Sequence, residues 1–218
     1  MSIALSIGNN LTTNGVFTAD AVNNTSVTNV TDFASVPGGG ALKLLSTQTA
    51  SASATIDFTS GIDSTYDSYV FKFINIHPAT DDVNFEFQAS TNNGSSYGVT
   101  ATTTVFRAGH AENDTTPTFG YFTNDDLAQS TSYQRLDAGR TGNGNDEHYS
   151  GTLQIFNPSS TTFVKHFIAT GEAYKSNDQP MNSFIAGYFN TTSAVDAVQF
   201  KFDSGNIDDG IIKMYGVV

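Results

Sequence analysis

The sequence of 218 residues contains no cysteine, and it has only 9 lysines and arginines against 21 aspartates and glutamates. Without cysteine, the chain can form no disulfide framework, no thiolate metal site and no cysteine nucleophile. The net charge of −12 repels phosphate backbones and anionic lipid, so we expect no nucleic-acid partner. No apolar run approaches the length of a membrane-spanning segment, and we therefore expect no membrane insertion.

The first residues also lack the pattern of an export signal. The stretch MSIALSIGNNLTTNG has neither a basic n-region nor a sustained apolar h-region. We therefore expect no secretory signal peptide in this sequence.

Motifs that carry catalytic or metal chemistry are missing as well. The four histidines have no metal-ligand spacing to one another, and there is no His-Glu-x-x-His pattern, P-loop or Gly-x-Ser-x-Gly elbow. Adjacent carboxylates fall in turns, where Asp is a natural residue. We therefore expect a protein that is not an enzyme and that has no cofactor and no metal. An irregular Ca²⁺ site remains an alternative at the acidic pairs Asp81-Asp82, Asp125-Asp126 and Asp208-Asp209.

What the sequence does contain is aromatic residues in β-strand patterns, with 17 Phe and 9 Tyr. Residues 67–90 read as two strands joined by a short turn. In the second strand Val83, Phe85 and Phe87 alternate strictly with polar residues, as in a half-buried strand. Pro78 in the turn fixes φ and has no N–H for a ladder. We predict a hairpin here that contributes aromatic side chains to a sheet core.

Further strands follow at fairly even spacing, separated by turns rich in Gly and Asn, and we find no amphipathic helix. A total of eight to ten strands predicts an all-β fold, an antiparallel β-sandwich of jelly-roll type, over residues 49–218. Besides the two strands of residues 67–90, the strand candidates cover residues 51–58, 97–107, 149–157, 161–174, 182–190, 197–202 and 210–218, with two short ones around 119–122 and 132–136 in the irregular part.

Residues 1–48 differ in composition from the rest, being rich in Thr, Asn, Val, Ala and Gly. Ile3, Leu5 and Ile7 alternate as a docking strand would, and residues 37–40 (PGGG) break regular structure. We predict an extended N-terminal docking arm that is ordered by a partner or a neighbouring copy. A flexible tail is the alternative.

Residues 108–148 are the least regular part of the chain, and long irregular stretches in compact domains are often functional. Aromatic residues in or beside this stretch could stack against a sugar, although a Phe- and Tyr-rich core would explain them equally well. The two histidines here could join a site only if the fold brings them together. The predicted recognition surface consists of Tyr97, Phe106, His110, Tyr121, Tyr133 and His148.

Several phrases of the sequence resemble structural proteins of marine tailed bacteriophages, of the kind described as virion or tail-fibre-like proteins. The phrases are TYDSYVFKFINIHPATDDVNFEFQASTNNGSSY (65–97), FRAGHAENDT (106–115), LQIFNPSSTTFVKHFIAT (153–170), NTTSAVDAVQFKFDSGNID (190–208) and the ending GIIKMYGVV. The resemblance covers residues 50–218, and the arm lies outside it.

This resemblance implies a β-sandwich module displayed on the virion, commonly as a homotrimer, with no cofactor and with other capsid or tail proteins as partners. Assembly in the host cytoplasm would need neither secretion nor disulfides. Two functions fit the resemblance. One is a structural role as a capsid decoration or short fibre anchored by its arm. The alternative is a receptor- or carbohydrate-binding fibre tip that recognises host glycans.

Overall fold

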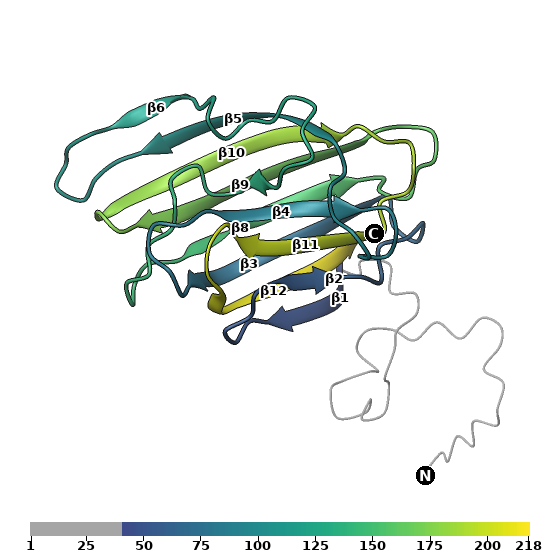
Figure 1. Ribbon diagram of the computed structural model, residues 1–218, viewed down its shortest axis with the longest axis horizontal. Coiled ribbons are helices and arrows are strands. Elements are labelled where there is room, and N and C mark those ends of the chain that lie inside the picture. The colour runs from purple at the N-terminus through teal and green to yellow at the C-terminus, as the bar shows by residue number, and fades with distance from the viewer. Residues whose placement is uncertain (1–40) are drawn as a thin grey trace, which may run out of the picture. The chain divides into compact units, whose positions relative to one another are not determined.

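The computed structural model describes residues 41–218, and this part of the chain consists of strands and connecting loops (Figure 1). No helix in this range is long and apolar enough to cross a membrane. The twelve strands are β1 (Leu42–Thr49), β2 (Ile56–Phe58), β3 (Ser68–Pro78), β4 (Phe85–Ser90), β5 (Ala101–Gly109), β6 (Thr118–Tyr121), β7 (Gln134–Arg135), β8 (Tyr149–Phe156), β9 (Lys165–Lys175), β10 (Gln179–Phe189), β11 (Ala197–Phe202) and β12 (Ile207–Val217).

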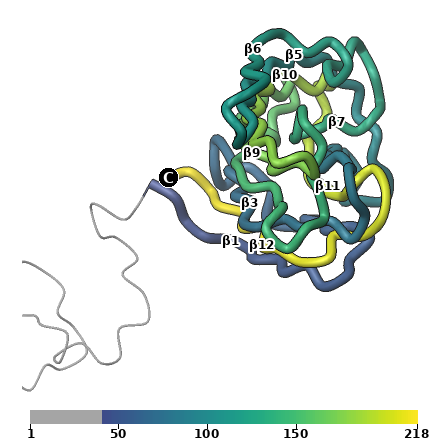
Figure 2. Tube along the Cα trace, turned by 90° about the vertical axis from the view of Figure 1, so that its left-hand side faces the viewer, coloured from purple at the N-terminus to yellow at the C-terminus, as the bar shows by residue number. Residues whose placement is uncertain are grey.

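The strands form two antiparallel sheets that pack face to face. The larger sheet has eight strands in the order β1-β12-β3-β8-β9-β10-β5-β6, and the smaller has four in the order β2-β11-β4-β7. Figure 2 shows β7 and β11 of the smaller sheet on one side of the layer that contains β9 and β10. The prediction of an all-β antiparallel sandwich is therefore confirmed.

The chain crosses between the two sheets eight times, twice for each strand of the smaller sheet. β1, β3, β8 and β12 lie in the larger sheet, whereas their sequence neighbours β2, β4, β7 and β11 form the smaller one. These eight strands make two facing layers, β1-β12-β3-β8 and β2-β11-β4-β7. Two hairpins, β9 with β10 and β5 with β6, extend the larger sheet beyond β8.

The hairpin predicted at residues 67–90 is wrong in its pairing. Both strands exist, but β3 pairs with β12 and β8, while β4 pairs with β11 and β7. The connection after Pro78 crosses from one sheet to the other, so the two strands face each other through their side chains. The ring centroids of Phe73 and Phe85 accordingly lie 5.3 Å apart across the sandwich.

The core between the sheets is built mainly from phenylalanine. Phe200 of β11 is completely buried and sits at the centre of this cluster. Aromatic rings at such separations add to the free energy gained from burying their apolar surface. The ring centroid of Phe200 lies between 5.1 and 6.3 Å from those of Phe58, Phe71, Phe73, Phe85 and Phe87.

The sandwich begins earlier in the chain than predicted. β1 pairs with β12 from Leu42 opposite Val217 to Thr49 opposite Ile211. The predicted boundary between residues 48 and 49 therefore falls inside a paired strand, and residues 42–48 belong to the larger sheet. The rest of the predicted docking arm lies outside the described residues.

Residues 122–141 cover the inner face of the larger sheet where the smaller sheet ends. Thr103 Oγ1 of β5 donates to Gln134 Oε1 at 2.6 Å, and the Ala138 N–H donates to Ser183 Oγ of β10 at 2.8 Å. Thr103 and Ser183 are both buried. These contacts fix the irregular segment against β5 and β10 and so position the site described below.

Candidate functional site

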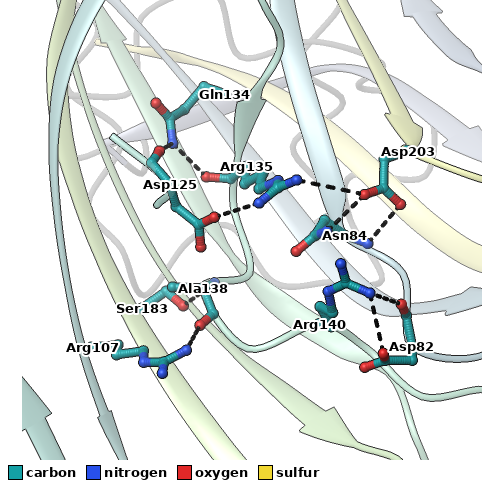
Figure 3. Close-up of polar contacts among 10 residues, drawn as sticks. All are labelled: Asp82, Asn84, Arg107, Asp125, Gln134, Arg135, Ala138, Arg140, Ser183 and Asp203. Carbon is teal, nitrogen blue, oxygen red and sulfur yellow. Dashed lines mark hydrogen bonds and ion pairs between the residues drawn. The ribbon is translucent and has the colours of Figure 1, made fainter. Parts of the chain in front are cut away.

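All three arginines of the chain line one pocket of about 250 Å³, together with one lysine. Arg107 comes from β5, Arg135 from β7, Arg140 from the loop after β7, and Lys175 from the end of β9. Figure 3 shows the three arginines and their polar contacts. We call this site the cationic pocket.

The charge of the pocket is opposite to that of the chain. Its lining has four cations and the two carboxylates of Asp82 and Asp125, so four minus two gives a local net charge of +2. The chain as a whole carries −12. Positive charge concentrated in a concave site makes the local electrostatic potential more positive, and the site then attracts a negatively charged ligand.

Arg135 is neutralised by carboxylates. Its Nη1 lies 2.7 Å from Asp125 Oδ1, and only 2% of the Asp125 side chain is exposed. Its Nη2 lies 4.0 Å from Asp203 Oδ2. Asp203 also accepts hydrogen bonds from the backbone N–H and the side-chain amide of Asn84, at 3.0 and 2.7 Å. Arg135 therefore serves mainly to fix the wall of the pocket.

Arg140 lies at the solvent-exposed mouth. Its Nη1 is 3.1 Å from Asp82 Oδ2 and 3.0 Å from the Asp82 carbonyl oxygen. Half of each side chain is exposed, 50% for Arg140 and 53% for Asp82. Exposed pairs of this kind contribute little to stability, so the Arg140 guanidinium can exchange its partner at small cost.

Arg107 and Lys175 have no carboxylate partner among residues 41–218. Arg107 Nη1 donates to the Ala138 carbonyl oxygen at 2.5 Å, and its Cζ lies 3.6 Å from the centroid of the Phe122 ring. The Lys175 amine makes no hydrogen bond within the described residues. Burial lowers the pKa of Lys175, and the nearby Arg107 and Arg140 lower it further against the opposing effect of Asp82.

Two of the predicted recognition residues lie together on the outward face of the larger sheet, which is the face that points away from the cationic pocket. Phe106 of β5 stands opposite Tyr121 of β6 in the strand register. The Phe106 ring stacks on Phe184 at 4.8 Å and 8°, and it contacts Phe119 edge-on at 6.2 Å. We call Phe106, Phe119, Tyr121 and Phe184 the outer aromatic patch. Their exposed fractions of 40, 80, 55 and 39% show that these rings are not core residues.

Two more predicted residues, Tyr97 and Tyr133, lie in connecting segments beside the smaller sheet. The Tyr133 hydroxyl hydrogen-bonds Gln199 Oε1 on the outward face of β11, and Lys201 Nζ lies 4.4 Å from its ring centroid. The Tyr97 hydroxyl is buried and has no hydrogen-bond partner within residues 41–218. Burial, followed by the nearby Asp57 carboxylate, raises the pKa of Tyr97. These two tyrosines therefore lie on the other side of the sandwich from the outer aromatic patch.

The two predicted histidines lie in separate connecting segments of the chain. His110 lies in the turn after β5, with its Nε2 3.2 Å from Asp114 Oδ1. The His148 ring contacts the Asp146 carbonyl oxygen at 3.2 Å, just before β8. The six predicted residues thus do not assemble into one surface, because they lie on different elements: Phe106 and Tyr121 are on the larger sheet, whereas Tyr133 contacts β11 of the smaller sheet.

The acidic pairs are occupied by other contacts. Asp82 and Asp125 form ion pairs with Arg140 and Arg135. Across residues 41–218, no three His, Asp or Glu side chains are grouped so that they could hold a metal ion. The alternative of a Ca²⁺ site therefore has no support from these pairs.

Comparisons with protein-family models, curated proteins and solved structures found no match to this chain.

Sequence reasoning missed the cationic pocket, although one signal was present. The three arginines of an acidic chain all fall within residues 107–140. No motif links them, and their meeting depends on how residues 122–141 fold back over β5 and β10. The irregular stretch 108–148 indicated the position of the pocket better than its aromatic residues did, since this stretch contributes most of the pocket lining.

Proposed function

We propose that this chain is a non-enzymatic structural module of a bacteriophage virion surface, either a capsid decoration protein or a short fibre. The observation that carries the proposal is the strand order, in which β1-β12-β3-β8 faces β2-β11-β4-β7. We take these eight strands to be a jelly roll, an architecture that viral capsid and lectin domains use. The resemblance of residues 50–218 to phage virion proteins supports the same role.

The proposal includes a homotrimer that is attached to other capsid or tail proteins through residues 1–40. β1 follows these residues directly and is an edge strand of the larger sheet, paired only with β12 among the described strands. An attachment segment would therefore leave the sandwich at a sheet edge without disturbing the core. The acidic surface would keep such a module soluble before assembly.

Molecular mass in solution tests this assembly role. Light scattering should give a trimer for the full chain and a monomer for a chain that lacks residues 1–40. This truncation spares β1, which begins at Leu42, so the sandwich itself should still fold. If both chains are monomers, residues 1–40 have no role in self-association and the homotrimer is rejected.

The outer aromatic patch favours a second candidate function, recognition of a host glycan. Four exposed aromatic rings on one sheet face can stack against the apolar face of a sugar ring. Replacing Phe119, the most exposed of them at 80%, with Ser should abolish binding on a glycan array while leaving the melting temperature unchanged. Retention of glycan binding by Phe119→Ser would exclude the patch as the recognition site.

A further inference from the structure

We propose that the cationic pocket binds the anionic group of an acidic sugar, with Lys175 and Arg107 supplying the positive charge that no carboxylate of the described chain compensates. This site lies on the other face of β5 from the outer aromatic patch. The inference rests on the pocket's own contacts and holds whether or not the chain belongs to a virion.

The need for an anion follows from the cations that converge in the pocket. Arg107, Arg140 and Lys175 line the same space of about 250 Å³, and only Arg140 has a carboxylate partner there. Like charges held close together in a partly buried site repel one another, and a bound oxyanion relieves this repulsion. Guanidinium groups also match the geometry of carboxylate, sulfate and phosphate oxygens.

The remaining lining distinguishes an acidic sugar from a bare inorganic ion. Sulfate is negatively charged and has no hydrogen-bond donor, so the carboxylates of Asp82 and Asp125 repel it and no hydrogen bond to them offsets the repulsion. A sugar acid carries an anionic group and also hydroxyl groups, which can donate hydrogen bonds to the Asp82 carboxylate and to the side-chain carbonyl oxygen of Asn124. Phe122 offers an apolar ring at the same wall.

The size of the pocket and the net charge of the chain favour a ligand of one monosaccharide unit over a long polyanion. Its volume of about 250 Å³ is below the range of about 300–1,000 Å³ that is usual for drug-sized ligands, so it suits one monosaccharide unit. The net charge of −12 opposes binding of long polyanions such as nucleic acid. The pocket opens to solvent at the half-exposed side chains of Arg140 and Asp82, where a ligand can enter.

Titration calorimetry on the full chain tests the inference, with glucuronate, glucose and sodium sulfate as probes at constant ionic strength. We expect glucuronate to bind with one-to-one stoichiometry, more tightly than sulfate, and glucose to show no binding. Lys175→Met removes one charge-assisted contact and should weaken glucuronate binding about tenfold.

Lys213→Met is the matched control. It removes one lysine from β12, between the buried Ile212 and Met214, so it changes the net charge equally on the outward face and should bind like the wild type. Arg140→Gln, at a half-exposed position, provides a second pocket variant if Lys175→Met does not fold. Equal affinities of the pocket variants and Lys213→Met would overturn the proposed site. Sulfate binding as tight as glucuronate binding would overturn the sugar assignment.

Discussion

At the scale of single residues, the carboxyl group of Asp137 couples the stability of this sandwich to pH. The residue is fully buried. Its Oδ2 accepts a hydrogen bond from Thr141 Oγ1 at 2.7 Å, while Oδ1 has no partner within residues 41–218. Burial raises the pKa of Asp137 well above its ordinary value, because the apolar surroundings disfavour the charged form.

Replacing Asp137 with Asn should therefore change the pH dependence of stability. A carboxyl group whose pKa is raised by folding contributes its full stability below its unfolded pKa of about 3.9, and this contribution is lost as the pH rises toward the folded pKa. Asn cannot ionise, so the stability of Asp137→Asn relative to the wild type should increase as the pH rises above about 4, by up to about 1.4 kcal/mol per pH unit. Urea unfolding at several pH values measures this difference, and a constant difference would show that Asp137 is ionised in the fold.

Phe200 provides the clearest test of the core. Truncating it should remove contacts to five neighbouring rings and leave a cavity. We expect Phe200→Ala to lower the free energy of unfolding by about 3–5 kcal/mol. Phe119→Ala, at an 80% exposed position, is the control and should change it by less than about 0.5 kcal/mol. Chemical denaturation that gave both variants equal losses would contradict the assigned core.

Residue alternation in the sequence identifies which phenylalanines can share a face, but not which face is covered. Phe200 and Phe106 each stand beside a charged residue in a strand, Lys201 and Arg107 respectively. Phe200 is nevertheless at the centre of the core, whereas Phe106 lies on the outward face. Burial depends on which sheet closes over the strand, and this information lies in contacts between distant segments. The predicted recognition residues therefore divided between the two faces of the sandwich.

At the scale of elements, β1 protects the edge of the larger sheet. Its pairing with β12 covers the backbone groups of that strand from Ile211 to Val217. Unpaired strand edges are templates for aggregation. We expect removal of residues 1–40 to leave the melting temperature unchanged, whereas removal of residues 1–49 should lower it and cause aggregation. Calorimetry and light scattering on both chains measure this, and a soluble, equally stable chain without β1 would contradict the assignment.

Most strand positions could be predicted from the sequence, but strand partners could not. The strand predicted at residues 197–202 is found at those residues as β11, and the one at 149–157 corresponds to β8. The strand predicted at 161–174 begins later, at Lys165, whose buried amine donates to the Phe163 and Thr191 carbonyl oxygens at 2.9 and 3.1 Å. Local alternation determines which residues can form a strand, whereas pairing across the two sheets depends on chain crossings that leave no local pattern.

At the scale of the whole molecule, the distribution of charge links the fold to its proposed roles. An acidic chain places all three arginines in one pocket, on the inner side of strands whose outward side carries the outer aromatic patch. The sequence indicated the acidic surface and the irregular stretch that builds the pocket. The convergence of β5, β7 and β9 on one site could not be predicted, because it requires the strand order of both sheets.

The virion role is the central claim, and the composition of purified particles tests it most directly. Particles should be purified by density gradient from lysates of cultures that produce this chain, and their proteins should be quantified by mass spectrometry. Our account predicts that the chain travels with capsid and tail proteins at a fixed copy number that is a multiple of three. Recovery of the chain only in the soluble fraction, with none in the particles, would contradict it.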